Sequence, residues 1–155
     1  MTAYKHILVP LDFSDTSTRA FEHAKMLAER FDASLELLHV VPNPFIANAA
    51  SLYVGMPLPQ DFLNQLEQDA RQRLGATLTV TERERFKARS VVRIGDPLFE
   101  IVEHARTEHI DVIVMGTHGR TGVSHLFLGS VAERVVRTAE CPVLTVKTPF
   151  PQAAR

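Results

Sequence analysis

The segment Asp111–Val136, DVIVMGTHGRTGVSHLFLGSVAERVV, joins a short apolar run to a helical pattern through a glycine-rich stretch. Residues 111–115 have the length and composition of a buried strand, and a helix is expected from about 129 to 139. A buried strand followed by a connection and a helix is the unit from which parallel α/β sheets are built. The segment therefore favours an α/β fold.

The rest of the chain repeats this alternation of strand and helix. Apolar runs predict strands at residues 5–11, 34–41, 87–94, 111–115 and 142–147, and helical spacing predicts helices at about 15–30, 60–78, 97–109 and 129–139. The stretch from Pro42 to Pro59 contains four prolines and is expected to be a long loop, whereas the charged run 81–89 is expected to be a solvated face. Strands this apolar are covered on both faces, and right-handed crossovers predict a single-domain, doubly wound parallel sheet with helices on both faces.

Length, charge and cysteine content exclude several classes of protein. The 155 residues suit one domain, expected over residues 1–148, with a short tail at 149–155. A net charge of −1 gives no electrostatic basis for binding nucleic acid or an anionic membrane. The single cysteine, Cys141, cannot form an internal disulfide and is expected to be a small core residue. No apolar stretch is long enough to cross a bilayer, so a cytoplasmic protein is expected.

The glycine-rich stretch has features of a phosphate-binding loop. A phosphate needs several N–H donors that converge without Cβ atoms in the way, and the free N–H groups at a helix start favour an anion. The residues that would supply these features are Gly116, His118, Gly119, Arg120, Gly122, Gly129 and Ser130. The spacing matches neither the P-loop nor the dinucleotide fingerprint, so a plain strand-to-helix connection with Ser130 as an ordinary cap stays open. Its place after the carboxyl end of a parallel strand favours binding.

Asp12 is the second candidate for a nucleotide site. It directly follows the first strand, and a carboxylate there can accept hydrogen bonds from ribose hydroxyls or an adenine amino group. The alternative is that Asp12 helps to start the next helix, as Ser14 and Asp15 also can. The two roles are not separable from the sequence.

The histidines give no sign of a metal or catalytic centre. His39 lies within an apolar strand and is expected to be a hydrogen-bonded core residue, whereas His104 and His109 are expected on a helix surface. His118 and His125 lack a Cys or His partner at metal-binding spacing, so no zinc site is expected. No nucleophile elbow and no paired catalytic carboxylates are present in the sequence.

Several motifs, in order along the chain, resemble those of the universal stress protein family. The most specific is G-x-x-G-(nine residues)-G-[ST], formed by Gly116, Gly119, Gly129 and Ser130. The stretch ILVPLDFSDTS resembles the family's first strand with its D-x-S-x-x-S continuation. LLHVVP resembles its second strand, GDP its third strand-to-helix turn, and CPVLTVK its last strand. The resemblance covers nearly the whole chain, to about Lys147.

The resemblance implies a five-stranded sheet in the order 3-2-1-4-5, with strands one and four at the switch point. In the family's ATP-binding branch the nucleotide lies there, and this sequence retains the glycine pattern of that branch. The resemblance places Pro10, Leu11 and Asp12 beside the adenosine, Val41 at the adenine, and Met115 and Gly116 in the floor. It places the phosphates among His118, Gly119, Arg120, Gly129, Ser130 and Val131.

The expected function is that of an ATP-binding regulatory or stress-response protein. ATP, carried with Mg²⁺, would set conformation or the affinity for an unidentified protein partner, with little or no hydrolysis. A homodimer is expected through the last strand, Val143 to Lys147, which lies at the sheet edge in the implied order. Two alternatives remain: a slow ATPase or nucleotidyl-transfer enzyme of a related adenine-nucleotide α/β fold, and a dimeric scaffold whose pocket stays empty.

Overall fold

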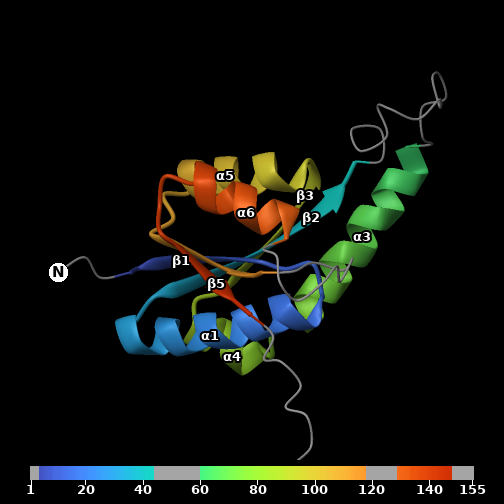
Figure 1. Cartoon of the computed structure of the whole chain (residues 1–155). Helices are drawn as coiled ribbons and strands as arrows, with labels where there is room; N and C mark the ends of the chain where they lie inside the picture. The colour runs from blue at the N-terminus through green and yellow to red at the C-terminus, as the bar shows by residue number, and fades with distance from the viewer. Residues whose placement is uncertain (1–3, 44–59, 118–128, 148–155) are drawn as a thin grey trace, which may run out of the picture.

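The computed structural model describes residues 4–43, 60–117 and 129–147, which form one parallel α/β domain (Figure 1). The elements follow in the order β1 (His6–Pro10), α1 (Asp15–Phe31), β2 (Ser34–Pro42), α3 (Gln60–Ala76), α4 (Val80–Arg85), β3 (Arg89–Gly95), α5 (Pro97–Thr107), β4 (Val112–Gly116), α6 (Ser130–Thr138) and β5 (Val143–Val146). Among the helices of these ranges, none has both the length and the apolarity to cross a bilayer.

The five strands form one sheet in the order β3-β2-β1-β4-β5, and every pairing is parallel. β1 is central, because its Ile7 is in register with Leu35 of β2 on one side and with Val112 of β4 on the other. This confirms the predicted doubly wound sheet and its strand order. From β1 the chain first adds β2 and β3 on one side and then β4 and β5 on the other, so the strand order reverses between β1 and β4, where parallel sheets offer a binding crevice.

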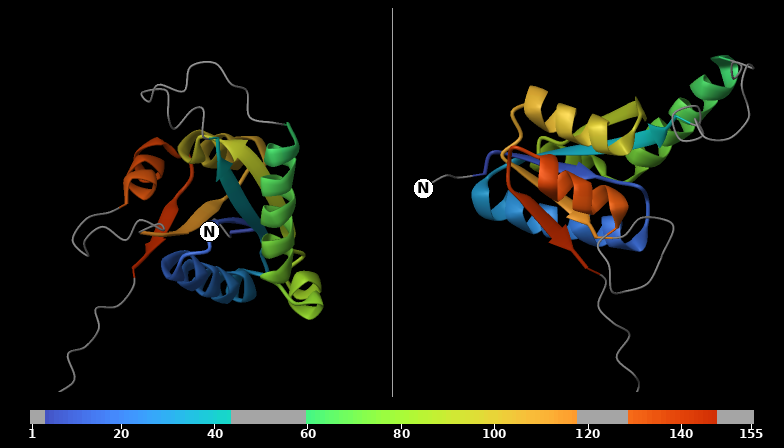
Figure 2. Two further views of the ribbon diagram at one scale, coloured as in Figure 1. Left: turned by 90° about the vertical axis from the view of Figure 1, so that its right-hand side faces the viewer. Right: turned by 45° about the horizontal axis from the view of Figure 1, so that its top comes forward.

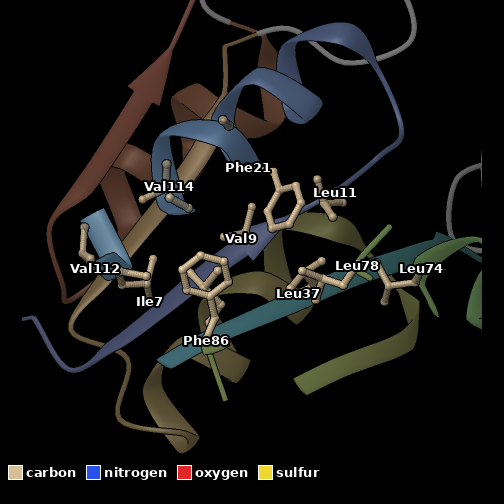
Figure 3. Packing of buried hydrophobic residues seen from close by; sticks show 14 of the residues in the cluster. Ile7, Val9, Leu11, Phe21, Leu37, Leu74, Leu78, Phe86, Val112 and Val114 are labelled. Atoms are coloured by element: carbon tan, nitrogen blue, oxygen red, sulfur yellow. The ribbon is translucent and has the colours of Figure 1, made fainter. Parts of the chain in front are cut away.

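Helices cover both faces of the sheet. α5 and α6 lie on one face, while α1 and α3 cover the other with α4 beside α1 (Figures 1 and 2). Side chains alternate between the two cores, because successive residues of a strand point to opposite faces. Ile7 and Val9 of β1 point toward α1, where Figure 3 shows them packed near Phe21 and Phe86, and Leu8 points to the other core.

The helix starts agree with the capping residues in the sequence. Ser14 is the N-cap of α1, and its side chain accepts a hydrogen bond from the Ser17 N–H. Asp96 caps α5 through the Phe99 N–H, and Pro97 occupies the first turn. Cys141 is half-buried against the core under α5 and α6, and this burial raises the pKa of its thiol.

The charged run 81–89 is not simply a solvated face. Most of it forms α4, whose start is a capping box: the Thr79 hydroxyl accepts from the Glu82 N–H, and the Glu82 carboxylate accepts from the Thr79 N–H. Glu82 also meets Lys25 of α1 at 3.0 Å, which ties α4 to the domain. β3 begins at Arg89 rather than at Lys87, because Lys87 has a left-handed φ of 46° that a strand does not allow.

The expected surface position of His104 is wrong. Its side chain is buried on the inner face of α5 together with Ile101 and Ala105. The Nε2 atom lies 3.1 Å from Oε1 of Glu36 on β2, which is itself buried. A carboxylate in the sheet therefore supplies the polar neighbour that makes a buried histidine acceptable on a helix face that is otherwise apolar.

Candidate functional site

A cavity of about 830 Å³ lies at the carboxyl ends of the central strands. Its walls come from the ends of β1, β2 and β4 and from α3, α5 and α6. This is the place where ligands bind in open parallel sheets, and the volume is in the range of small-molecule sites. We refer to it as the strand-end cavity.

The strand-end cavity brings together every predicted site residue that the structure describes. These are Pro10, Leu11, Asp12, Val41, Met115, Gly116, Gly129, Ser130 and Val131. The remaining predicted residues, His118, Gly119 and Arg120, lie outside the described residues. Contact of any of these residues with a nucleotide stays a prediction.

Asp12 lies in the cavity wall and also supports the start of α1. Its Oδ1 atom accepts hydrogen bonds from the Ser14 N–H at 3.0 Å and from the Ser14 hydroxyl at 2.5 Å. Ser14 in turn caps α1. The two roles that the sequence left open are therefore compatible, because Asp12 acts on the helix through Ser14 while remaining at the cavity.

Phe13 follows Asp12 with a left-handed φ of 64°, which is unfavourable for a residue with a large side chain. Its ring lies 4.5 Å from the His39 ring, centroid to centroid, and 4.1 Å from the guanidinium carbon of Arg73 on α3. His39 is a buried core residue, as predicted, and its Nδ1 lies 2.6 Å from the Leu11 carbonyl oxygen. Phe13, His39 and Arg73 all line the cavity.

None of these three residues was among the predicted site residues. Phe13 adjoins Asp12, so its position after the first strand was a usable signal. The sequence contained no such signal for Arg73, because helical periodicity does not show where α3 lies relative to the sheet. Figures 1 and 2 show α3 running beside β2, which places it at the cavity rim.

Gly116 closes the end of β4 against α1. A Cβ atom at this position would lie 2.8 Å from the Thr16 carbonyl carbon and 2.9 Å from the Ser17 nitrogen. Backbone atoms of a helix cannot move aside cheaply, so glycine is required here by packing alone. The predicted role of Gly116 in approaching phosphates adds to this requirement and is not needed to explain it.

The start of α6 forms the opposite wall of the cavity. Gly129 occupies the N-cap position without a side-chain cap, and Ser130 is the first residue of α6, so the alternative of Ser130 as an ordinary cap does not hold. The Gly129 N–H donates to the Thr117 carbonyl at 2.6 Å, which holds the helix start against the end of β4. Gly129, Ser130, Val131 and Ala132 then line the cavity. The positive end of the α6 dipole and its first N–H groups favour an anion there.

The cavity therefore offers an anion-favouring wall at α6 and a carboxylate at Asp12. Between them the lining is mainly apolar, with Leu38, Val40 and Ile101 among its members. Within residues 4–43, 60–117 and 129–147, no three His, Cys, Asp or Glu side chains are grouped as metal ligands. A ligand with an apolar ring, hydroxyl donors and an anionic end matches this distribution.

Known proteins show the same fold and related sequences. The model of the universal stress protein family matches residues 3–147. Universal stress protein MJ0531 of Methanocaldococcus jannaschii is 38% identical over 149 residues, which cover 94% of this chain and 84% of that protein. The solved structure of MJ0577 from the same organism has a TM-score of 0.79 and 29% identity, covering 96% of this chain and 99% of that one.

A universal stress protein solved in complex with cAMP is also similar. It is 26% identical with a TM-score of 0.60, and the match covers 96% of this chain and 100% of that one. Sequence and fold thus agree over almost the full length. The chain belongs to the universal stress protein family.

Proposed function

We propose that the chain binds an adenine nucleotide in the strand-end cavity, and that the preferred ligand is ATP with Mg²⁺. The observation that carries this is the convergence of Asp12 and the α6 start, far apart in sequence, on one cavity. The carboxylate would accept from the nucleoside, and the α6 N–H groups would donate to phosphate oxygens. A related universal stress protein has been solved in complex with cAMP, itself an adenine nucleotide, which supports this choice.

The nucleotide would act as a regulatory ligand in a cytoplasmic stress-response protein rather than as a substrate. Mg²⁺ would arrive on the phosphates, as it does in most nucleotide sites. Phosphoryl transfer needs a positioned nucleophile as well as charge neutralisation. The segment from Gly116 to Ser130 contains no carboxylate to orient water and no P-loop lysine. Hydrolysis is therefore expected far below the usual enzyme median of about 10 s⁻¹.

Calorimetric titration with ATP and Mg²⁺ tests the proposed site. Asp12→Asn keeps an oxygen that can accept from Ser14 but removes the charge. It should weaken ATP binding about ten- to a hundredfold, because a hydrogen bond to a charged group contributes roughly 1.5–3 kcal/mol. Asp15→Asn is the matched control. It removes an exposed carboxylate of the first turn of α1 that does not line the cavity, so it should bind ATP as wild type does.

Two results would contradict the proposal. Folded wild-type protein that binds no adenine nucleotide would refute the site altogether. Phosphate release near one per second from folded wild-type protein at saturating ATP would instead favour the ATPase.

A further inference from the structure

Arg73 of α3 contacts an aromatic ring in the turn that follows β1. The turn consists of Leu11, Asp12, Phe13 and Ser14, and we call it the β1 turn. The guanidinium carbon of Arg73 lies 4.1 Å from the Phe13 ring centroid, within the range of a cation–π contact. His39 of β2 contacts the same ring at 4.5 Å. The β1 turn is therefore held by side chains from a helix and from a neighbouring strand.

The guanidinium group of Arg73 contacts this ring, and among the described residues it forms no ion pair with a carboxylate. Asp69 precedes Arg73 by four residues, the spacing of a helical ion pair, yet among the described residues no ion pair joins them. Arg71, two residues away, does pair with Glu67 at 2.5 Å. Arg73 thus differs from its neighbour on the same helix, because it faces the cavity and the aromatic ring.

The β1 turn needs such support. Phe13 has a φ of 64°, a conformation that a large side chain does not favour by itself. Asp12 adjoins Phe13, and its carboxylate is oriented by the Ser14 N–H and hydroxyl. The position of the Asp12 carboxylate in the cavity therefore depends on the conformation of Phe13.

We propose that Arg73 is a positioning residue for ligand binding, which acts through Phe13 to hold the β1 turn in its binding conformation. The inference rests on the proposed function. Without the cation–π contact the turn populates other conformations, and the apparent affinity falls in proportion to the fraction that is still competent. A contact of this kind on a partly exposed ring corresponds to a loss of about two- to fivefold.

The type of nucleotide separates this role from direct contact with the ligand. Every nucleotide that uses Asp12 needs the β1 turn, so AMP and ATP should lose affinity by the same factor. If Arg73 instead neutralised phosphates, the loss would be larger for ATP than for AMP, because ATP carries more charge.

The experiment is calorimetric titration of AMP and of ATP with Mg²⁺ into folded variants. Arg73→Met keeps the apolar stem and removes the charge, and it should weaken both ligands about two- to fivefold. Arg73→Lys should recover part of the loss, since an ammonium also makes a cation–π contact. Arg71→Met is the matched control, because it removes an exposed charge from the same helix, and it should bind as wild type does.

A double-mutant cycle with Phe13→Leu tests whether Arg73 influences nucleotide affinity through the Phe13 ring. If Arg73 acts through the ring, Arg73→Met should change nothing further once Phe13 is replaced. Equal losses in both backgrounds, a larger loss for ATP than for AMP, or unchanged binding by Arg73→Met would each overturn the inference. Wild-type protein that binds neither nucleotide would refute the proposed function and this inference with it, so the two failures are distinguishable.

Discussion

At Gly116 the sequence and the structure give different reasons for a glycine. The sequence suggested that its lack of a Cβ lets phosphates approach, and the structure shows that the same lack lets α1 approach, with Thr16 backbone 2.8 Å from the position of a Cβ. The glycine at this position is therefore required by the fold and is not by itself evidence for a ligand. Asp12 is similar, because it serves α1 through Ser14 and also lines the cavity.

Glu36 and His104 form a buried polar pair that is remote from the proposed site. The carboxylate oxygen and the ring nitrogen are 3.1 Å apart, and Arg89 lies 3.8 Å from the same oxygen. His104 and, more weakly, Arg89 hold the pKa of the Glu36 carboxyl below its usual value, although burial opposes them. A carboxyl with a lowered pKa stabilises the fold above its unfolded pKa, about 4.3, and this contribution is lost as the pH falls through the folded value.

Glu36→Gln should therefore be destabilising in a pH-dependent way. At pH 7 we expect a decrease in the free energy of unfolding of about 1–3 kcal/mol, because His104 loses its charged partner. The difference from wild type should shrink as the pH falls from the unfolded pKa of about 4.3 through the lower pKa of Glu36 in the fold, where the wild-type carboxyl also becomes protonated. Urea unfolding from pH 7 to pH 3 measures this, with the exposed Glu84→Gln as control. A difference that stays constant over that range would contradict the assignment.

At the scale of elements, apolar periodicity predicted all five strands and the four longer helices. Their order in the sheet came from the resemblance to the family and not from periodicity, because pattern alone does not say which strands are neighbours. α4 was not predicted, because its six residues are too few and too charged to show an apolar face. Its capping box, Thr79 with Glu82, was nonetheless present in the sequence as an unused signal.

The capping box should be necessary for the stability that α4 adds. Thr79→Ala removes the hydroxyl that accepts from the Glu82 N–H, and a lost cap costs about 1 kcal/mol of unfolding free energy. Thr79→Ser retains the hydroxyl and should be close to wild type. Thr81→Ala, one position inside the same helix, is the control for the loss of a threonine. Urea unfolding midpoints compare the three, and equal effects of Thr79→Ala and Thr81→Ala would argue against the cap.

At the scale of the whole molecule, the strand-end cavity depends on segments that are distant in sequence. Three distant parts of the chain contribute to it, represented by Asp12, Arg73 and Gly129. They meet at the cavity because β1 and β4 are adjacent and α3 packs beside β2. Position after a strand identified Asp12 and Gly129 in advance. The contribution of α3 could not be foreseen, because helix placement on a sheet is set by tertiary packing. The contact of Arg73 with the Phe13 ring follows from that placement, whereas the contacts of His39 with Leu11 and Phe13 join β2 to the turn after β1.

Among the described strands β5 forms one edge of the sheet, and we propose that two chains pair there. β5 joins β4 alone among the described strands, and Leu144 on β5 and Val136 on α6 expose 41% and 46% of their surface. The β4 side of β5 is used by Pro142 and Val146, whose carbonyls accept from Ile113 and Thr117. Because neighbouring residues of a strand alternate in direction, the Thr145 N–H should point to the free edge.

Thr145→Pro should therefore weaken a homodimer without removing a bond between β4 and β5. A two-fold axis would pair the same strand of each subunit, so one substitution removes two edge donors per dimer. At about 0.5–1.5 kcal/mol each, the dissociation constant should rise about five- to a hundredfold or more. Thr145→Ala, which keeps the N–H, should remain dimeric. Light scattering across micromolar concentrations, with a thermal melt to verify folding, measures both. A wild-type monomer throughout that range, or a folded Thr145→Pro variant as dimeric as wild type, would rule out pairing through this edge.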